Sequence, residues 1–310
     1  MAKPFAYIRL LRPVHWSKNV FVFAALIFAE QNLMFEPDKI VATLIAFGSF
    51  CLISSFAYVI NDIHDVEQDR LHPRKRKRPL ASGEVPMHAA WTLAVALVLA
   101  GVFLAFGFKF LLGVVAAAYL LLNVGYSFWF KHMLIIDVMC IAIGFVLRAL
   151  AGVFAIGVPL SPWLIVCTFT LCLFVGFGKR RTELAVAKND HQLASDRRPV
   201  LANYTLELLG HLLSISAALA VITFLLYTMD PSTAAKFGTN YLIYTVPFVV
   251  YGVFRFAVII QTGKYDGPME LLVEDRPFQA TVIVWLVLAA VIVHEGPQIR
   301  IWLHRLADWY

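Results

Sequence analysis

Residues 40–70 read IVATLIAFGSFCLISSFAYVINDIHDVEQDR, and they join a long apolar run to a dense group of charges. The run at 40–60 has no charged side chain and is about as long as the roughly 20 residues that a membrane-spanning helix needs. Asp62, Asp65 and Asp69 follow at helical spacing, so a helix that continued out of the run would carry them on one face. The stretch therefore predicts a membrane-spanning helix that ends in a row of carboxylates.

The same apolar character recurs along the chain, which has 310 residues, 60% hydrophobic and 15% charged. Runs of near-spanning length lie at 19–34, 40–60, 88–107, 110–129, 134–156, 161–178, 209–229, 240–261 and 279–294. Backbone polar groups in a bilayer must be satisfied internally, which runs of this length achieve as helices. The sequence therefore predicts an all-α polytopic membrane protein with nine transmembrane helices in a single domain, residues 1–310, and it disfavours a soluble protein.

Basic residues concentrate in the segments that would lie on one side of the bilayer. Few Lys and Arg residues fall in segments on the opposite side: Lys39, Lys109, Lys236, Arg300 and Arg305. Because basic residues of short loops stay in the cytoplasm, we expect a cytoplasmic N-terminus and a C-terminus outside. The net charge of +6 mainly reflects this asymmetry and gives no indication of nucleic acid as a partner.

Two long inner loops, 61–87 and 179–208, hold most of the charge and are expected to form a cytoplasmic active site. In the first loop, Asp62, Asp65 and Asp69 would repel one another on one helix face unless a cation lay between them. Mg²⁺ suits such a face, because it shares its coordination shell between carboxylates, water and substrate phosphates. All three are predicted metal ligands, and Asp62 and Asp65 are the predicted catalytic residues.

The carboxylates are followed by a basic run that could bind phosphate oxygens. The residues predicted to bind the substrate around this loop are Asn61, Lys75, Arg76 and Arg78. Acidic face and basic run together indicate a metal-chelated diphosphate site. In the alternative reading, the carboxylates only pair with the basic run at a solvated surface, and the run sets topology or contacts anionic lipid.

Several motifs resemble those of one family. NDIHDVEQD at 61–69 resembles the NDxxDxxxD motif of the UbiA superfamily of intramembrane prenyltransferases. Further matching stretches are RPVHWSKN at 12–19, DRLHPRKRKRPLASG at 69–83, YSFWFK at 126–131, GFVLRALAG at 144–152 and GKRRTEL at 178–184. The resemblance implies a nine-helix bundle with a cytoplasmic-facing site. Together the motifs resemble the branch that transfers 5-phosphoribosyl from phosphoribosyl diphosphate to a polyprenyl phosphate of decaprenyl type, with Mg²⁺ as cofactor.

GKRRTEL separates this branch from typical prenyltransferases of the superfamily, which carry a second aspartate-rich motif there. This chain has three basic residues and a single acid, Glu183, so the cluster would bind phosphate directly. The alternative enzyme is a prenyltransferase with a prenyl diphosphate donor and an aromatic acceptor. Such an enzyme would be expected to carry the second acidic motif, which is absent at this place in the sequence. A transporter would instead place polar groups near the bilayer midplane.

Other residues are further candidates for substrate binding: Lys18, Tyr126, Lys131, Arg148, Lys179 and Glu183. Each has a structural alternative. Lys18, Tyr126 and Lys131 could be interface anchors, Arg148 could pair inside the bundle, and Lys179 with Glu183 could be a helix ion pair.

The resemblance also implies a bacterial inner membrane location and a product used for a cell-envelope glycan. No protein nucleophile is expected, since a polyprenyl phosphate is already an anion and can attack the ribose carbon C1. Prenyl chain length and oligomeric state, a homo-oligomer included, stay open.

Overall fold

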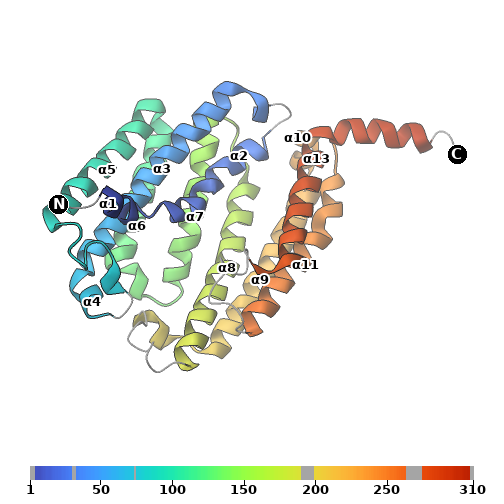
Figure 1. Cartoon of the computed structure of the whole chain (residues 1–310). Helices are drawn as coiled ribbons and strands as arrows, with labels where there is room; N and C mark the ends of the chain where they lie inside the picture. The colour runs from blue at the N-terminus through green and yellow to red at the C-terminus, as the bar shows by residue number, and fades with distance from the viewer. Residues whose placement is uncertain (1–3, 30–32, 73–74, 190–198, 263–273, 308–310) are drawn as a thin grey trace. The chain divides into compact units, whose positions relative to one another are not determined.

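The computed structural model describes residues 4–29, 33–72, 75–189, 199–262 and 274–307. In these ranges the chain is helical and contains no strand, which confirms the all-α prediction (Figure 1). Eight segments are long and apolar enough to cross a membrane, so this is a multi-pass integral membrane protein. They lie in α3 (Pro37–His64), α5 (Met87–Phe108), α6 (Phe110–Phe128), α7 (Ile136–Ile156), α8 (Pro162–Asn189), α9 (Leu206–Met229), η7 (Tyr241–Thr245) with α11 (Val246–Thr262), and α13 (Arg276–Ala307).

Shorter helices connect these segments. They are α1 (Pro4–Leu11), η1 (Pro13–Phe23), α2 (Ala24–Ile27), η2 (Leu33–Phe35), α4 (Val66–Leu71), η3 (Lys75–Lys77), η4 (Phe130–His132), η6 (Pro199–Asn203) and α10 (Pro231–Phe237).

The first predicted span, 19–34, is not one long α-helix in the described residues, so the number of nine spans is not confirmed. It lies mostly in η1, a 3₁₀ helix of 11 residues, and in the short α2. Close packing on α7 accompanies this geometry, because a Cβ built on Gly152 would lie 2.0 Å from the carbonyl oxygen of Val22. With a rise of about 2.0 Å per residue, a 3₁₀ segment extends further than an α-helix of equal length.

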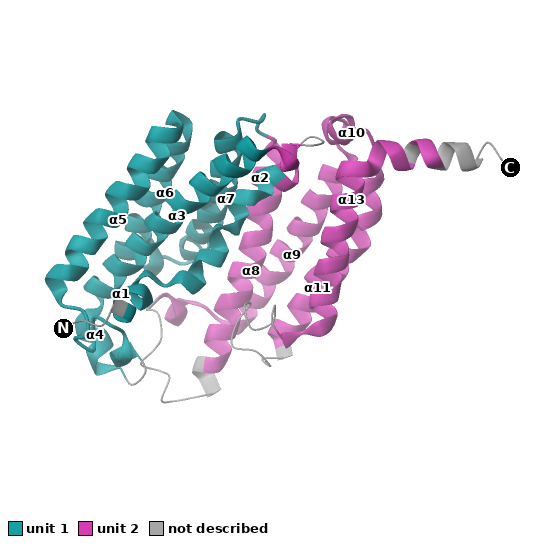
Figure 2. Cartoon of the chain, turned by 45° about the horizontal axis from the view of Figure 1, so that its top comes forward, with its two compact units in different colours: residues 1–26, 37–160 teal, residues 27–36, 161–310 magenta. Residues whose placement is uncertain are grey.

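The chain divides into two compact units, which Figure 2 shows in teal and magenta. Unit 1 contains residues 1–26 and 37–160, and unit 2 contains residues 27–36 and 161–310. The interpretation of residues 1–310 as one domain stays a prediction.

Unit 1 is built around α3, which packs against η1, α5, α6 and α7. Gly101 lets α5 approach α3 closely, since a Cβ there would lie 2.8 Å from the side chain of Ile53. The Ser49 hydroxyl donates a hydrogen bond of 2.8 Å to the Gly101 carbonyl at the same crossing. Towards α4, the core of the unit gathers Leu10, Val59 and Leu80 with other apolar side chains of α1, α3, α4 and α5.

Unit 2 is built around α8 and α9, with α11 and α13 packed beside them. Its main core joins Phe174, Leu213, Phe256 and Ile260 from three of these helices. The rings of Phe174 and Phe256 lie 4.9 Å apart between centroids. Many other large apolar side chains of both units are exposed, as expected for surfaces that lipid covers.

Two lysines of the predicted outer segments, Lys39 and Lys109, bind backbone carbonyls at the C-terminal end of α7. Gly157 adopts a left-handed conformation (φ 74°) directly after the helix. The ammonium group of Lys109 donates to the Ala155 carbonyl at 2.8 Å, and that of Lys39 donates to the Ile156 carbonyl at 2.9 Å. The last carbonyls of a helix lack intrahelical partners and carry partial negative charge, so both lysines stabilise this end.

Candidate active site

The predicted carboxylates lie where α3 passes into α4. The two helices are separated by Asp65 alone, since α3 ends at His64 and α4 begins at Val66. The backbone N–H of Asp65 donates to the Asn61 carbonyl at 2.9 Å, and that of Asp69 donates to the Asp65 carbonyl at 2.8 Å. The helical register therefore continues through the junction, as the spacing of the three aspartates predicted.

Asp62 and Asp69 form a buried pair bridged by one arginine. Nη1 of Arg78 lies 3.2 Å from Oδ1 of Asp62 and 2.6 Å from Oδ2 of Asp69. A second arginine, Arg12, donates from Nη2 to Oδ1 of Asp62 at 2.5 Å. Two carboxylates thus share the charge of two guanidinium groups. We call these four side chains the Asp–Arg cluster.

The turn after η3 brings Arg78 to this cluster. The N–H of Arg78 donates to the Lys75 carbonyl at 2.9 Å, and that of Ser82 donates to the Arg78 carbonyl at 2.9 Å. Gly83 continues the turn with a positive φ of 78°. Leu80 and Val85 anchor the segment in the core of unit 1. The sequence PLASGEV therefore folds into a turn that places the backbone of Arg78 beside the aspartates.

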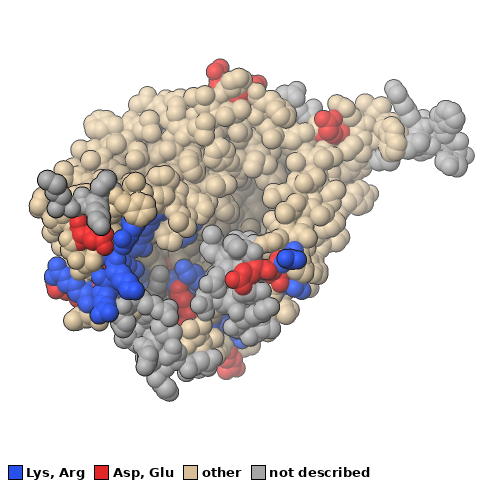
Figure 3. Space-filling view, in the orientation of Figure 1, with Lys and Arg blue, Asp and Glu red and all other residues tan. Residues whose placement is uncertain are grey.

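Asp65 has different partners from the other two aspartates. Its Oδ1 lies 2.9 Å from Nδ1 of His64 and 3.9 Å from Nζ of Lys131, which belongs to η4. The structure therefore brings the candidates Asp65 and Lys131 together. Figure 3 shows Lys and Arg side chains gathered with Asp and Glu at the end of unit 1 that carries α4.

The remaining candidates of the first loop lie around this group. Asn61 and Tyr126 are half-buried on α3 and α6, and Lys18 is half-buried on η1. Lys75 is half-buried at the start of η3, where its N–H donates to Nδ1 of His72 at 3.1 Å, and Arg76 is exposed beside it.

A divalent cation fits the buried carboxylate pair. In the described part of the chain, no three His, Cys, Asp or Glu side chains converge as a metal site. Mg²⁺ does not need three, because it is usually held by one or two carboxylates together with substrate phosphates and water. Asp62 and Asp69 both contact the single nitrogen Nη1 of Arg78, so their carboxylates face one common position where a cation could lie.

Arg148 lies apart from the aspartates, in a buried network between η1, α3, α6 and α7. Its Nε donates to Oδ1 of Asn19 at 2.7 Å, Nη1 to the Gly144 carbonyl at 2.9 Å and Nη2 to the Tyr119 hydroxyl at 2.5 Å. The Ser54 hydroxyl joins the same group through Asn19 and Tyr119. The structure therefore places this candidate among protein partners.

The candidates of the second loop lie in unit 2, on α8, which continues as helix to Asn189. Glu183 accepts a 2.5 Å bond from Nη1 of Arg180 and lies 3.8 Å from Nζ of Lys179. Arg180 is almost fully buried, and Arg181 donates to the Ile260 carbonyl at 3.2 Å. The predicted helix pair of Lys179 and Glu183 is present, but Arg180 makes the shorter contact. Residues 190–198 of this loop lie outside the described residues.

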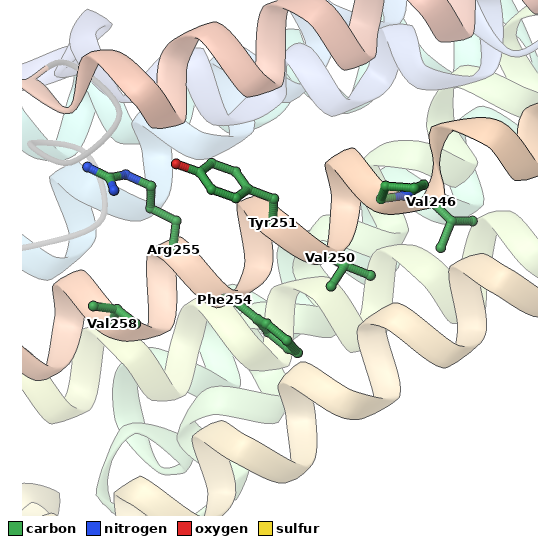
Figure 4. A pocket seen from close by; sticks show the side chains of 7 residues that line it. Val246, Val250, Tyr251, Phe254, Arg255 and Val258 are labelled. Carbon is green, nitrogen blue, oxygen red and sulfur yellow. The ribbon is translucent and has the colours of Figure 1, made fainter.

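Unit 2 also has a cavity of about 580 Å³ along α11, which Figure 4 shows. Tyr251 and Arg255 project from the same side of the helix there. Both Nε and Nη2 of Arg255 donate to the Asp275 carboxylate, at 2.7 and 2.8 Å. Asp275 also accepts the N–H of Phe278 at 2.8 Å, so the ion pair fixes the start of α13.

The sequence did not identify Arg12 as a site residue, and it gave Arg180 only as part of a basic cluster. Arg12 is the first residue of the family-like motif RPVHWSKN, which could have marked it as a candidate. Nothing in that motif, however, connects it to Asp62, 50 residues away. Arg180 was part of the quoted GKRRTEL cluster, but its burial depends on the packing of α8.

Residues 19–272 match the UbiA prenyltransferase family. A decaprenyl-phosphate phosphoribosyltransferase of Corynebacterium glutamicum is 35% identical over 297 residues, covering 94% of this chain and 87% of that protein. A protein of the same name from Mycobacterium tuberculosis is 30% identical over 291 residues, covering 93% and 94%.

Among solved structures, a UbiA homologue from Archaeoglobus fulgidus bound to GPP and Mg²⁺ is similar with a TM-score of 0.67. It is 21% identical, and the match covers 93% of this chain and 99% of the other. This likeness shows that the two chains share a fold.

Proposed function

Because the chain belongs to the UbiA prenyltransferase family, we propose that it transfers 5-phosphoribosyl from phosphoribosyl diphosphate to a polyprenyl phosphate of decaprenyl type, with release of diphosphate. Relatives of at least 30% identity over most of the chain carry the name decaprenyl-phosphate phosphoribosyltransferase, which supports this choice within the family.

The observation that carries the proposal is the charge of the 179–183 cluster. Its one acid, Glu183, is already bonded to Arg180 and close to Lys179. The cluster therefore offers positive charge for phosphate groups, and its single carboxylate is already engaged by basic side chains. Phosphoribosyl diphosphate and a polyprenyl phosphate together carry more phosphate groups than a prenyl diphosphate does.

In the proposed reaction, an oxygen of the polyprenyl phosphate forms a bond to C1 of the ribose while the bond from C1 to the diphosphate oxygen breaks. Positive charge develops on the sugar and negative charge on the departing diphosphate, as in other glycosyl transfers. The protein must neutralise the leaving group and align two anions that repel each other.

The residues of unit 1 divide these tasks. Asp62, Asp65 and Asp69 would hold Mg²⁺, which supplies positive charge to the leaving diphosphate when it is bound. Basic and polar side chains would bind phosphate or ribose oxygens: Lys18, Asn61, Lys75, Arg76, Arg78, Tyr126 and Lys131. In unit 2, Lys179 and Glu183 stay proposed substrate ligands, with the Lys179 ammonium as the group that would bind a further phosphate. Arg148 stays a proposed substrate ligand with its protein network as the alternative.

The proposed location is a bacterial inner membrane with the N-terminus in the cytoplasm, so that the site meets a water-soluble donor and a lipid acceptor. A phosphoribosylated polyprenyl phosphate would serve as a precursor of a cell-envelope glycan.

The test is transfer of label into lipid. Purified protein receives Mg²⁺, polyprenyl phosphate and labelled phosphoribosyl diphosphate, and the lipid phase is then counted. We expect metal-dependent label that is lost in Asp62→Asn and Asp65→Asn. Glu67→Gln is the matched control, because Glu67 is an exposed acid on α4 that pairs with Arg70. A protein that leaves the lipid unlabelled but joins a labelled prenyl diphosphate to an aromatic acceptor would refute the proposed donor.

A further inference from the structure

The carboxylates of the Asp–Arg cluster lie beneath its arginines. The side chains of Asp62 and Asp69 are 2% and 5% exposed, whereas those of Arg12 and Arg78 are 23% and 30% exposed. A group that arrives from solvent therefore meets the guanidinium groups before it reaches the carboxylates.

Arg78 fills the space that a shared cation would need. Its Nη1 lies between Oδ1 of Asp62 and Oδ2 of Asp69, at 3.2 and 2.6 Å. A Mg²⁺ ion lies about 2.0–2.1 Å from its oxygen ligands, in a near-octahedral arrangement. The ion and Nη1 cannot occupy the same position, so an ion that bridges Oδ1 of Asp62 and Oδ2 of Asp69 would displace Arg78.

Arg12, which contacts Asp62 through its side chain, has an unfavourable backbone conformation. Its φ of 53° and ψ of 60° are left-handed, which is uncommon for a residue with a Cβ atom. Its guanidinium carbon lies 5.1 Å from the centre of the Tyr58 ring, so the guanidinium group contacts Tyr58 as well as Asp62. Strained backbones persist where surrounding contacts determine them, and they gather at functional sites.

We propose that Arg12 and Arg78 are displaceable counter-ions of the Asp62–Asp69 pair, which leave the carboxylates for phosphate oxygens when a diphosphate arrives with a divalent cation. The inference rests on the proposed function and deepens it, because it adds Arg12 to the diphosphate-binding residues and makes metal binding depend on the donor.

Charge balances before and after the exchange. Two arginines neutralise two carboxylates in the absence of substrate, and one divalent cation does so afterwards. The released guanidinium groups then face the diphosphate, and a planar guanidinium binds phosphate as readily as it binds carboxylate. Metal alone would have to displace the arginines without offering them new partners, so it should bind weakly.

The metal and the diphosphate must then tighten each other's binding by the same factor. If diphosphate tightens the binding of the metal, the metal tightens the binding of diphosphate by the same factor. Removal of either arginine should make the metal site available without diphosphate and should reduce this mutual assistance.

The experiment measures the affinity of the purified full-length protein for Mn²⁺ by electron paramagnetic resonance, with and without inorganic diphosphate. Free Mn²⁺ is corrected for its complex with diphosphate. We expect diphosphate to tighten Mn²⁺ binding to the unaltered protein by about tenfold or more. Arg78→Gln and Arg12→Gln should each tighten Mn²⁺ binding without diphosphate by about tenfold and reduce the effect of diphosphate.

Arg9→Gln is the matched control, since Arg9 lies on α1 and pairs with Glu84 and the Lys77 carbonyl, outside the cluster. It should change Mn²⁺ binding by less than about twofold, because exposed charges act weakly through solvent. If a Gln variant does not fold, Arg78→Lys replaces it and should give a smaller increase. Unchanged or weaker Mn²⁺ binding in folded variants would overturn the proposal.

The assay contains neither ribose donor nor lipid, so its outcome is separate from that of the transfer assay. Coupled metal binding without label transfer would refute the proposed function and leave the exchange intact. Label transfer without tighter Mn²⁺ binding in the arginine variants would refute the exchange alone.

Discussion

Arg148 of α7 lies against Tyr119 of α6, bonded to its hydroxyl at 2.5 Å and with its guanidinium carbon 4.6 Å from the ring centre. Within the described part of unit 1, its guanidinium bonds go to neutral oxygens of Tyr119, Asn19 and Gly144. A charged group in a membrane-spanning segment is costly unless its donors are satisfied. The Tyr119–Arg148 contact therefore contributes to holding η1, α6 and α7 together.

Tyr119→Phe tests this contact. The change removes one hydroxyl that accepts from Arg148 and contacts Ser54, and it leaves the ring in place. A buried donor without its partner costs about 1–3 kcal/mol, so the melting temperature of the purified protein should fall measurably. Tyr244→Phe is the control, because Tyr244 is largely exposed on η7, and it should leave the melting temperature unchanged. Equal melting temperatures for all three proteins would contradict a stabilising network.

Arg148→Lys separates a substrate contact from a structural one. Lysine keeps the charge but cannot reproduce the fork that reaches Asn19, Gly144 and Tyr119 together. If Arg148 has a structural role, the variant should have a lower melting temperature and a nearly unchanged KM for the labelled donor. A substrate ligand predicts a raised KM with little change in melting temperature. Measurement of both quantities on one preparation decides between the two roles.

Gly152→Ala tests the close packing of η1 on α7. The new methyl group would meet the Val22 carbonyl oxygen at 2.0 Å, and a backbone atom cannot move aside easily. Overpacking of this kind costs about 1–3 kcal/mol, so we expect a lower melting temperature and a lower yield of folded protein. Gly210→Ala on α9 is the control, since a Cβ there meets nothing within 4 Å. It should be neutral or stabilising by about 0.5–1 kcal/mol.

The membrane-spanning helices could be predicted from the sequence because the bilayer imposes one solution on long apolar runs. The conformation of the segment at 19–34 could not be predicted, since hydropathy does not distinguish a 3₁₀ helix from an α-helix and its packing partner Gly152 lies more than 100 residues away in the sequence. This segment alone accounts for the difference between the nine predicted spans and the eight found in the described residues.

The candidate site shows the same division between local and distant information. Asp62, Asp65 and Asp69 were predicted from spacing, because their helical register is a property of neighbouring residues. The identity of their partners was not predictable. Arg12 reaches Asp62 through a left-handed turn between α1 and η1, and no local pattern distinguishes it from Arg9, the other arginine of the N-terminal segment.

Lys109→Met tests the role of the lysines at the end of α7. The Lys109 ammonium donates to the Ala155 carbonyl beside the bond of Lys39 to Ile156, where the helix carries partial negative charge. Loss of one cation there should cost about 0.3–1 kcal/mol, and a double change with Lys39→Met should cost more than either alone. Lys77→Met, an exposed lysine of η3, controls for the lost charge. Thermal unfolding at low and high salt measures the effect, and a double variant as stable as the unaltered protein would show that the lysines serve topology only.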